Sequence, residues 1–432
     1  MTKINLLKEK GMPLEKQVKS WHEIVKRPYN RELIDSYSRT RQILLNGIET
    51  ESWFFKHSWV RLLDDLELKK ILVSLRRLED MQQTTINWLT PHNQSVLDTT
   101  LGYEQVAVDL TAWLAQNEDD EYVKETFDFG LLEDYDHLYR YSQFAYLIEE
   151  THPDIILHNN TDVTIGRPTQ FHHNCNALRI RKPYDKDKTS PKTKVNILTL
   201  ISAEQQTHNF YAEHGFMYGN TDLKRLYAEI CDVEEEHVTM YETLVPHNET
   251  LFEKWLIHEF TEACNYYNCY VDETDENLKL IWEEMLSMEI EHLKIAAKSY
   301  QKYENKDPEE IIGDCTVMPC HFESQKEYVK SVLNKETNKR VDKNGTFNTV
   351  DKLNDDWNSY NIQKSTGKDG VPSEQAINLS INSFNRDIVL ADGELINSQA
   401  NLLEKSLQKD GIASNTISVD KYKELQKIKF EY

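Results

Sequence analysis

The chain has 432 residues, of which 28% are charged and 39% hydrophobic, so it is long enough for a large core in roughly two or three structural units. Its formal net charge of −23 argues against nucleic acid and against a membrane as partners, because nucleic acid and anionic membranes both require a basic surface. No apolar run approaches the roughly 18 residues of a membrane span, and the N-terminus lacks a signal-peptide apolar segment, so we expect a cytoplasmic protein.

Helices are predicted along most of the chain up to residue 305. Residues 13–90 combine tryptophans with leucines at near-helical spacing, and a proline at 91 marks a boundary, so residues 1–95 are expected to form an N-terminal helical segment. Further on, a Thr-x-x-Glu capping box at residues 250–253 opens a helix. We expect helices near 96–115, 123–149, 195–215, 222–245, from 250 onward and 274–305, and an irregular segment at 150–194.

The composition changes after about residue 325. Asn, Asp, Ser and Lys dominate, aromatic residues become rare, and isolated apolar pairs replace the helical stripe. Segments that bury little apolar surface do not recover the entropy of ordering. The sequence therefore predicts a polar C-terminal region over residues 306–432 that is loosely packed or partly disordered.

One pattern, Glu-x29-[Asp/Glu]-x-x-His, occurs three times within the predicted helices. An acid and a His three residues apart lie one helical turn apart on one face and can bind one metal together. An acid 30 residues upstream fits the facing helix of an antiparallel hairpin. Two such hairpins would surround two metal ions with four carboxylates and two imidazoles. The copies are Glu104 with Asp134 and His137, Glu204 with Glu234 and His237, and Glu259 with Glu289 and His292.

The motif alone is weak, because acids are abundant in this chain. Glu149-x-x-His152, with Asp119 upstream, matches too, but Pro153 and the polar residues around Asp119 place it at helix ends. In the three copies the acids fall on apolar helix faces, where an ionised carboxylate costs several kcal/mol unless it is paired or binds a metal. The competing interpretation is carboxylates at helix surfaces or buried Glu–His hydrogen bonds.

A Glu helix followed by a Glu-x-x-His helix, a long crossover and the same pair again resembles the ferritin-like dimetal-carboxylate superfamily. The resemblance covers roughly residues 96–300. It implies an all-α protein, namely a ferritin-like up-down helical bundle with a long crossover, an extra helical hairpin and additional N-terminal helices. On this basis residues 96–305 are expected to form the dimetal bundle, with residues 150–194 as its crossover.

The crossover favours the first two copies as the pair that forms the site. One departure from the superfamily pattern is Asp134, which stands where Glu is usual. The third copy could instead complete the site, form a second site across a homodimer, or be a decayed copy kept for packing. His208, one turn after Glu204, is a candidate additional ligand or a core histidine, and His172-His173 in the crossover is a weaker candidate.

Oxygen and imidazole ligands without thiolates suit two Fe ions, or alternatively Mn or a mixed Fe/Mn pair. The resemblance then implies a metal-dependent oxidoreductase that activates O2 or peroxide, with an unknown small molecule as substrate. The alternatives are an iron-binding ferroxidase or storage-type protein, and a non-catalytic helical scaffold.

Overall fold

The computed structural model describes residues 4–384, except residues 175, 315–316, 318–320, 355–356 and 358. The described chain is predominantly helical, as predicted. Its long helices are α3 (Ser36–Val60), α4 (Leu66–Asn87), α5 (Val96–Asn117), α6 (Glu121–Glu149), α8 (Pro191–His214), α9 (Thr221–Glu242), α10 (Leu251–Asp272) and α11 (Glu276–Glu304). The shorter elements are α1 (Leu14–Gln17), α2 (Trp21–Ile24), α7 (Pro153–Leu157), α12 (Glu309–Ile312), α13 (Lys326–Glu336), α14 (Ser359–Thr366), α15 (Pro372–Phe384) and the antiparallel strands β1 (Lys339–Val341) and β2 (Phe347–Thr349).

Short polar side chains fix the starts of the long helices. The Asp120 carboxylate accepts from two backbone N–H groups in the first turn of α6, and Asn220 does the same for α9. Thr250 and Glu253 form the predicted capping box of α10. Each cap satisfies N–H groups that have no partner within the helix, typically contributing about 1 kcal/mol. The sequence therefore determines where these helices begin, and so at which level along each helix the residues of the candidate site lie.

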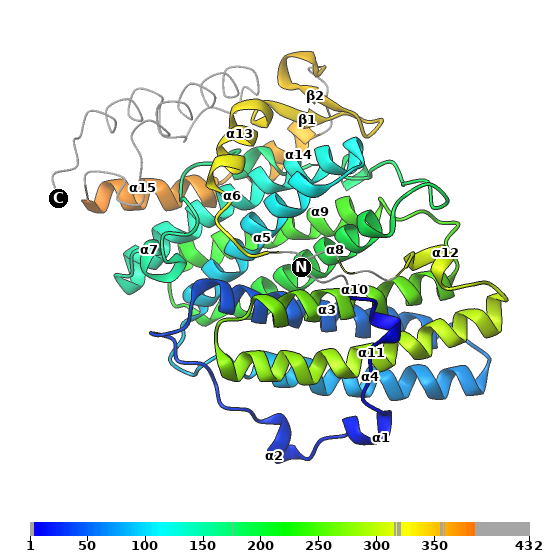
Figure 1. The fold of residues 1–432 in the computed structure, drawn as a ribbon. Helices are drawn as coiled ribbons and strands as arrows, with labels where there is room; N and C mark the ends of the chain where they lie inside the picture. The colour runs from blue at the N-terminus through cyan, green and yellow to red at the C-terminus, as the bar shows by residue number, and fades with distance from the viewer. Residues whose placement is uncertain are drawn as a thin grey trace.

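The eight long helices form four antiparallel hairpins, which combine in a nested order. The hairpins α5/α6 and α8/α9 pack together, while the outer hairpins α3/α4 and α10/α11 meet each other (Figure 1). In Figure 1 the outer pair occupies the lower half of the molecule and the inner pair the upper half. The first helices of the four hairpins, α3, α5, α8 and α10, lie between the two halves, and each contacts at least two of the others.

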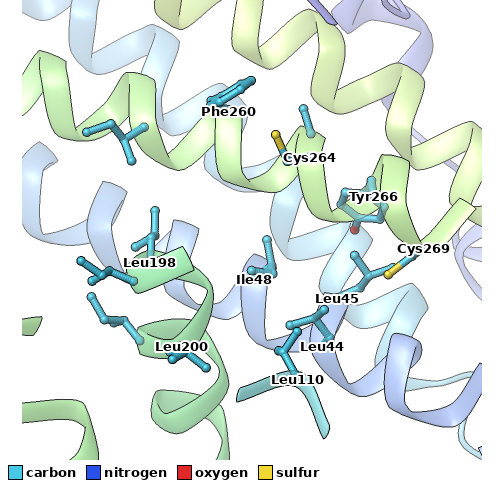
Figure 2. Close-up of a cluster of buried hydrophobic side chains, with 14 of the residues drawn as sticks. Leu44, Leu45, Ile48, Leu110, Leu198, Leu200, Phe260, Cys264, Tyr266 and Cys269 are labelled. Carbon is cyan, nitrogen blue, oxygen red and sulfur yellow. The ribbon is translucent and has the colours of Figure 1, made fainter. Parts of the chain in front are cut away.

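Apolar side chains from these four central helices form the core between the two halves. Figure 2 shows leucine, isoleucine, phenylalanine, tyrosine and cysteine side chains from α3, α5, α8 and α10 converging there. The buried side chains include Leu44, Leu45, Ile48, Leu110, Leu198, Leu200, Phe260, Cys264, Tyr266 and Cys269. Burying such side chains stabilises the fold by roughly 1.5–3 kcal/mol each before entropy is counted. This core separates the interiors of the two hairpin pairs.

The C-terminal region packs on the inner pair as far as residue 384. Helix α13 contacts α6 and α5, and α15 contacts α9 and α6. Val332 and Leu333 of α13 and Ile377 of α15 are buried in a common apolar cluster. The expectation of a loosely packed or disordered tail beyond residue 384 lies outside the described residues.

Within the described part of the chain, no helix is long and apolar enough to cross a membrane.

Candidate metal centre

Six buried side chains of the two inner hairpins converge between α5, α6, α8 and α9. We call them the first cluster, and all are 0–1% exposed. One ligand atom from each of Asp134, Glu204, Glu234 and His237 lies within 4.8 Å of the others. A second group, whose ligand atoms also lie within 4.8 Å of one another, contains Glu104, His137 and Glu234. The first cluster is thus Glu104, Asp134, His137, Glu204, Glu234 and His237, the two copies that the crossover argument paired.

Glu234 belongs to both groups and lies between the two imidazoles. Its Oε1 is 3.0 Å from Nδ1 of His137, and its Oε2 is 3.2 Å from Nδ1 of His237. The two rings are nearly parallel, with centroids 5.9 Å apart. Glu234 could therefore offer one oxygen to each of two cations held beside the two imidazoles.

Several ligand atoms of the first cluster have no hydrogen-bond partner within the described residues. They are Glu104 Oε2, both oxygens of Asp134, both oxygens of Glu204 and Nε2 of His137. Leaving a charged buried group unsatisfied costs well over 1–3 kcal/mol, so such atoms call for protons, water or a cation. Four carboxylates and two imidazoles without a thiolate form a donor set that fits two divalent iron or manganese ions.

Burial also governs how these carboxyl groups titrate. Burial and the neighbouring carboxylates raise the pKa of Glu104 and of Glu204 well above the usual value. Burial also raises the pKa of Asp134, although His237 opposes it. For Glu234, burial is outweighed by His137 and His237, which lower its pKa. In the absence of a cation the cluster therefore retains protons, and a binding metal would displace them.

Glu133, next to Asp134 in the chain, binds the ring nitrogen of His237 that points away from the other ligands. Its Oε2 lies 2.6 Å from Nε2 of His237, and its two oxygens accept from Arg167 at 2.8 Å and Arg179 at 2.9 Å. Burial opposes ionisation of Glu133, but Arg179, His172 and Arg167 outweigh it and lower its pKa. An ionised Glu133 accepts a hydrogen bond from the Nε2–H group of His237, so that Nδ1 faces the carboxylates of the first cluster. Metal-binding histidines commonly have such a carboxylate on the nitrogen that does not bind the metal.

Nδ1 of His237 faces three carboxylate oxygens, so an unprotonated nitrogen without a metal would be repelled by them. It lies 3.2 Å from Asp134 Oδ1, 3.2 Å from Glu234 Oε2 and 3.6 Å from Glu204 Oε2. Burial lowers the pKa of His237, yet Asp134 and its other acidic neighbours outweigh this and raise it well above the ordinary value. Either a second proton or a metal ion therefore sits between this nitrogen and the carboxylates.

The crossover segment supplies the arginines behind Glu133 and approaches α6 closely at Gly166. A Cβ at this position would clash with the carbonyl oxygen of Leu132 and would lie 2.7 Å from the backbone nitrogen of Asp136. The N–H of Arg167 donates to the same Leu132 carbonyl at 3.1 Å. Only glycine permits this contact, which places the Arg167 side chain against Glu133.

The remaining candidate histidines lie outside the first cluster. His208 is partly exposed, with Nδ1 3.0 Å from the carbonyl oxygen of Cys231, so the structure does not place it among the ligands. The ring of His172 lies 5.6 Å from that of His137 and is fully buried. His173 instead faces Glu229 and Asp232 on the outer side of α9.

The third copy lies with the N-terminal hairpin, not in the first cluster. Its residues Glu259, Glu289 and His292 meet acids on α3 and α4, forming a second cluster within the same chain. The second cluster consists of Glu49, Glu79, Gln82, Glu259, Glu262, Glu289 and His292, all 0–2% exposed, together with the fully buried Lys56. Helices α3 and α4 of the N-terminal segment are therefore half of a second hairpin pair, a role that the sequence did not predict for them.

A fourth, altered copy of the motif was recognisable in the N-terminal segment. Glu79 follows Glu49 by the same 30 residues, and Gln82 stands three residues later where the other copies have His. A motif that ends in His does not match it, so the sequence predicted only three copies. Glu133, Arg167 and Arg179 were missed for another reason, since their role depends on how the crossover lies against α6.

No family model, curated protein or solved structure matches this chain.

Proposed function

We propose that the first cluster holds two redox-active metal ions, iron or manganese, and that the protein is a metal-dependent oxidoreductase acting on O2 or peroxide together with a small substrate. The observation that carries the proposal is the set of unpartnered, fully buried carboxylate oxygens arranged in two groups that share Glu234. Two such ions would supply the electrons that reduce O2 or peroxide.

The charge of the ligand set supports redox chemistry over a purely structural ion. Four carboxylates carry four negative charges if all are ionised, which two divalent cations neutralise. Further positive charge on the cations is tolerated because the ligands are anionic oxygens, and this favours the higher oxidation states of iron and manganese. A structural zinc site would instead be closed, tetrahedral and commonly thiolate-rich.

The surrounding residues contribute orientation and exclude bulk water. Glu133 orients His237, and the Tyr211 hydroxyl donates to Glu104 Oε1. Tyr141 and Tyr241 are also buried beside the cluster, and their hydroxyls have no hydrogen-bond partner among the residues described. A dry, preorganised site of this kind strengthens electrostatic interactions with a bound reactant.

Anaerobic loading with Fe(II), followed by rapid mixing with air-saturated buffer, tests the proposal. We expect O2 uptake and a change in the near-UV or visible spectrum within seconds to minutes. A His137→Ala/His237→Ala variant should show neither. Iron-loaded protein with an unchanged spectrum and no O2 uptake over an hour would leave a structural site. Repeated uptake of Fe(II) with growth of a ferric mineral would indicate a ferroxidase or storage protein, and failure to hold iron would indicate a scaffold.

A further inference from the structure

The second cluster carries more negative charge than its own cationic groups can balance. Five glutamates, namely Glu49, Glu79, Glu259, Glu262 and Glu289, face one another in the interior between α3, α4, α10 and α11. The cationic groups among them are Lys56 and, when it is protonated, His292. Buried carboxylates in such excess require protons or a further cation.

The two clusters correspond residue by residue. Gln82 donates to Glu289 at 2.7 Å and to Glu49 at 3.0 Å, as His137 lies 3.0 Å from Glu234 in the first cluster. The pattern extends to the tyrosines, because Tyr266 donates to Glu49 as Tyr211 donates to Glu104. The equivalent pairs are Glu49 and Glu104, Glu79 and Asp134, Gln82 and His137, Glu259 and Glu204, Glu289 and Glu234, and His292 and His237.

Lys56 occupies the position in the second cluster that corresponds to the space between Asp134, Glu204 and His237 in the first cluster. Its Nζ is 2.5 Å from Glu79 Oε1 and 2.8 Å from Glu259 Oε1, the equivalents of Asp134 and Glu204. Burial lowers the pKa of Lys56, but Glu259, Glu79 and Glu262 outweigh this and keep it charged. An ammonium group thus occupies one of the two cation positions in this cluster.

The other cation position has only oxygen ligands. One carboxylate oxygen each from Glu49, Glu262 and Glu289 lies within 4.8 Å of the other two. Glu49 Oε2, Glu262 Oε2 and Gln82 Oε1 are buried and have no hydrogen-bond partner in the described chain. Glu262 is an addition, since Thr207 stands at the equivalent place in the first cluster. Carboxylate oxygens without imidazole favour hard cations such as Mg²⁺ and Mn²⁺.

We propose that the second cluster binds one hard divalent cation between Glu49, Glu262 and Glu289, and that the Lys56 ammonium permanently takes the place of the second cation. Such a site ties the N-terminal hairpin to α10/α11. It would be redox-silent with Mg²⁺, and it does not depend on the function proposed for the first cluster.

Manganese titration of a full-length variant with His137→Ala, His237→Ala, Glu204→Gln and Glu234→Gln tests the cation, because the first cluster then keeps only two of its six ligand side chains. Free Mn²⁺, followed by its electron paramagnetic resonance signal, should show about one bound ion per chain. Adding Glu49→Gln and Glu262→Gln should weaken that binding at least about tenfold. Adding Glu283→Gln instead, on the exposed side of α11, should leave the Mn²⁺ affinity unchanged. No bound Mn²⁺ in the parent variant, or equal binding in the two derived variants, would overturn the proposal.

A gain of binding tests the role of Lys56 and cannot arise from misfolding. Lys56→Met in the same background removes the ammonium but leaves Glu79, Glu259 and His292 in place. We expect the bound Mn²⁺ to rise from about one to about two ions per chain. An unchanged stoichiometry in a variant with native circular dichroism would overturn the claim that Lys56 stands in for a cation.

Discussion

Glu133 and Gln82 illustrate how single side chains decide the chemistry of each cluster. Glu133 accepts from Nε2 of His237 and so directs Nδ1 towards the carboxylates. Gln82 stands where the first cluster has the imidazole of His137, so the cation position between Glu49, Glu262 and Glu289 has only oxygen ligands. Gln82 on α4 stands at the position equivalent to His137 on α6, so this exchange of ligand type needs no change of the backbone.

Removing the charge of Glu133 should weaken metal binding without unfolding the protein. In Glu133→Gln the amide no longer holds His237 in the required tautomer, so we expect the affinity for Fe(II) or Mn(II) to fall about 10- to 100-fold. Competition titration against a metal indicator measures the change. Glu235→Gln, on the exposed side of α9, is the matched control. Wild-type affinity in Glu133→Gln would show that His237 does not require this partner.

Asp109 on α5 gives the stability of the protein a pH dependence of its own. The carboxyl accepts from Thr161 at 2.7 Å and Tyr37 at 3.1 Å, but burial raises its pKa to about 7. The folded state therefore holds a proton that the unfolded state has released, and the stability contributed by Asp109 falls as the pH rises from about 4 to about 7.

Asp109→Asn removes this titration and preserves an acceptor for both donors. The stability of the variant relative to the wild type should increase by about 3 kcal/mol between pH 5 and pH 8, because the folded pKa of about 7 lies about two units above pH 5 and each unit contributes about 1.36 kcal/mol. Urea unfolding of both proteins at the two pH values measures it, and titrations elsewhere cancel in the comparison. A pH-independent difference would mean that Asp109 is ionised throughout.

At the scale of elements, the close contact between Gly166 of the crossover and α6 positions Arg167 against Glu133, the partner of His237. Gly166→Ala would force the segment away from α6, because the new Cβ would meet the Leu132 carbonyl. We expect a loss of about 1–3 kcal/mol in stability together with weaker metal binding, since Arg167 moves away from Glu133. Gly219→Ala is the control, because no described atom lies within 4 Å of its added Cβ. Equal thermal unfolding midpoints for the two variants would contradict this account.

The hairpins of the inner pair could be predicted from the sequence because the motif fixes two helices and their relative height at once. The 30-residue offset between Glu204 and Glu234 spans one antiparallel hairpin, and the apolar faces around both acids required burial. The partner of α10/α11 could not be predicted in this way. Four hairpins can pair in several ways, and the fourth copy does not match the motif because it has Gln82 in place of His.

At the scale of the whole molecule, the nested order of hairpins gives two separate interiors. Glu104 follows Glu49 by 55 residues, and Glu259 follows Glu204 by the same distance, so the outer and inner halves repeat one arrangement. The apolar core from α3, α5, α8 and α10 lies between the two clusters (Figure 2). A change in one cluster should therefore leave the ligands of the other in place.

Iron analysis after anaerobic Fe(II) loading tests the central claim most directly, in the wild type and in His137→Ala, His237→Ala and His292→Ala. We expect about two firmly held iron ions per chain in the first cluster of the wild type, beside at most about one in the second cluster, a marked loss in His137→Ala and His237→Ala, and near wild-type content in His292→Ala. Fewer than about 0.3 ions per wild-type chain, or an equal loss in His292→Ala and His237→Ala, would contradict the assignment of the dimetal site to the first cluster.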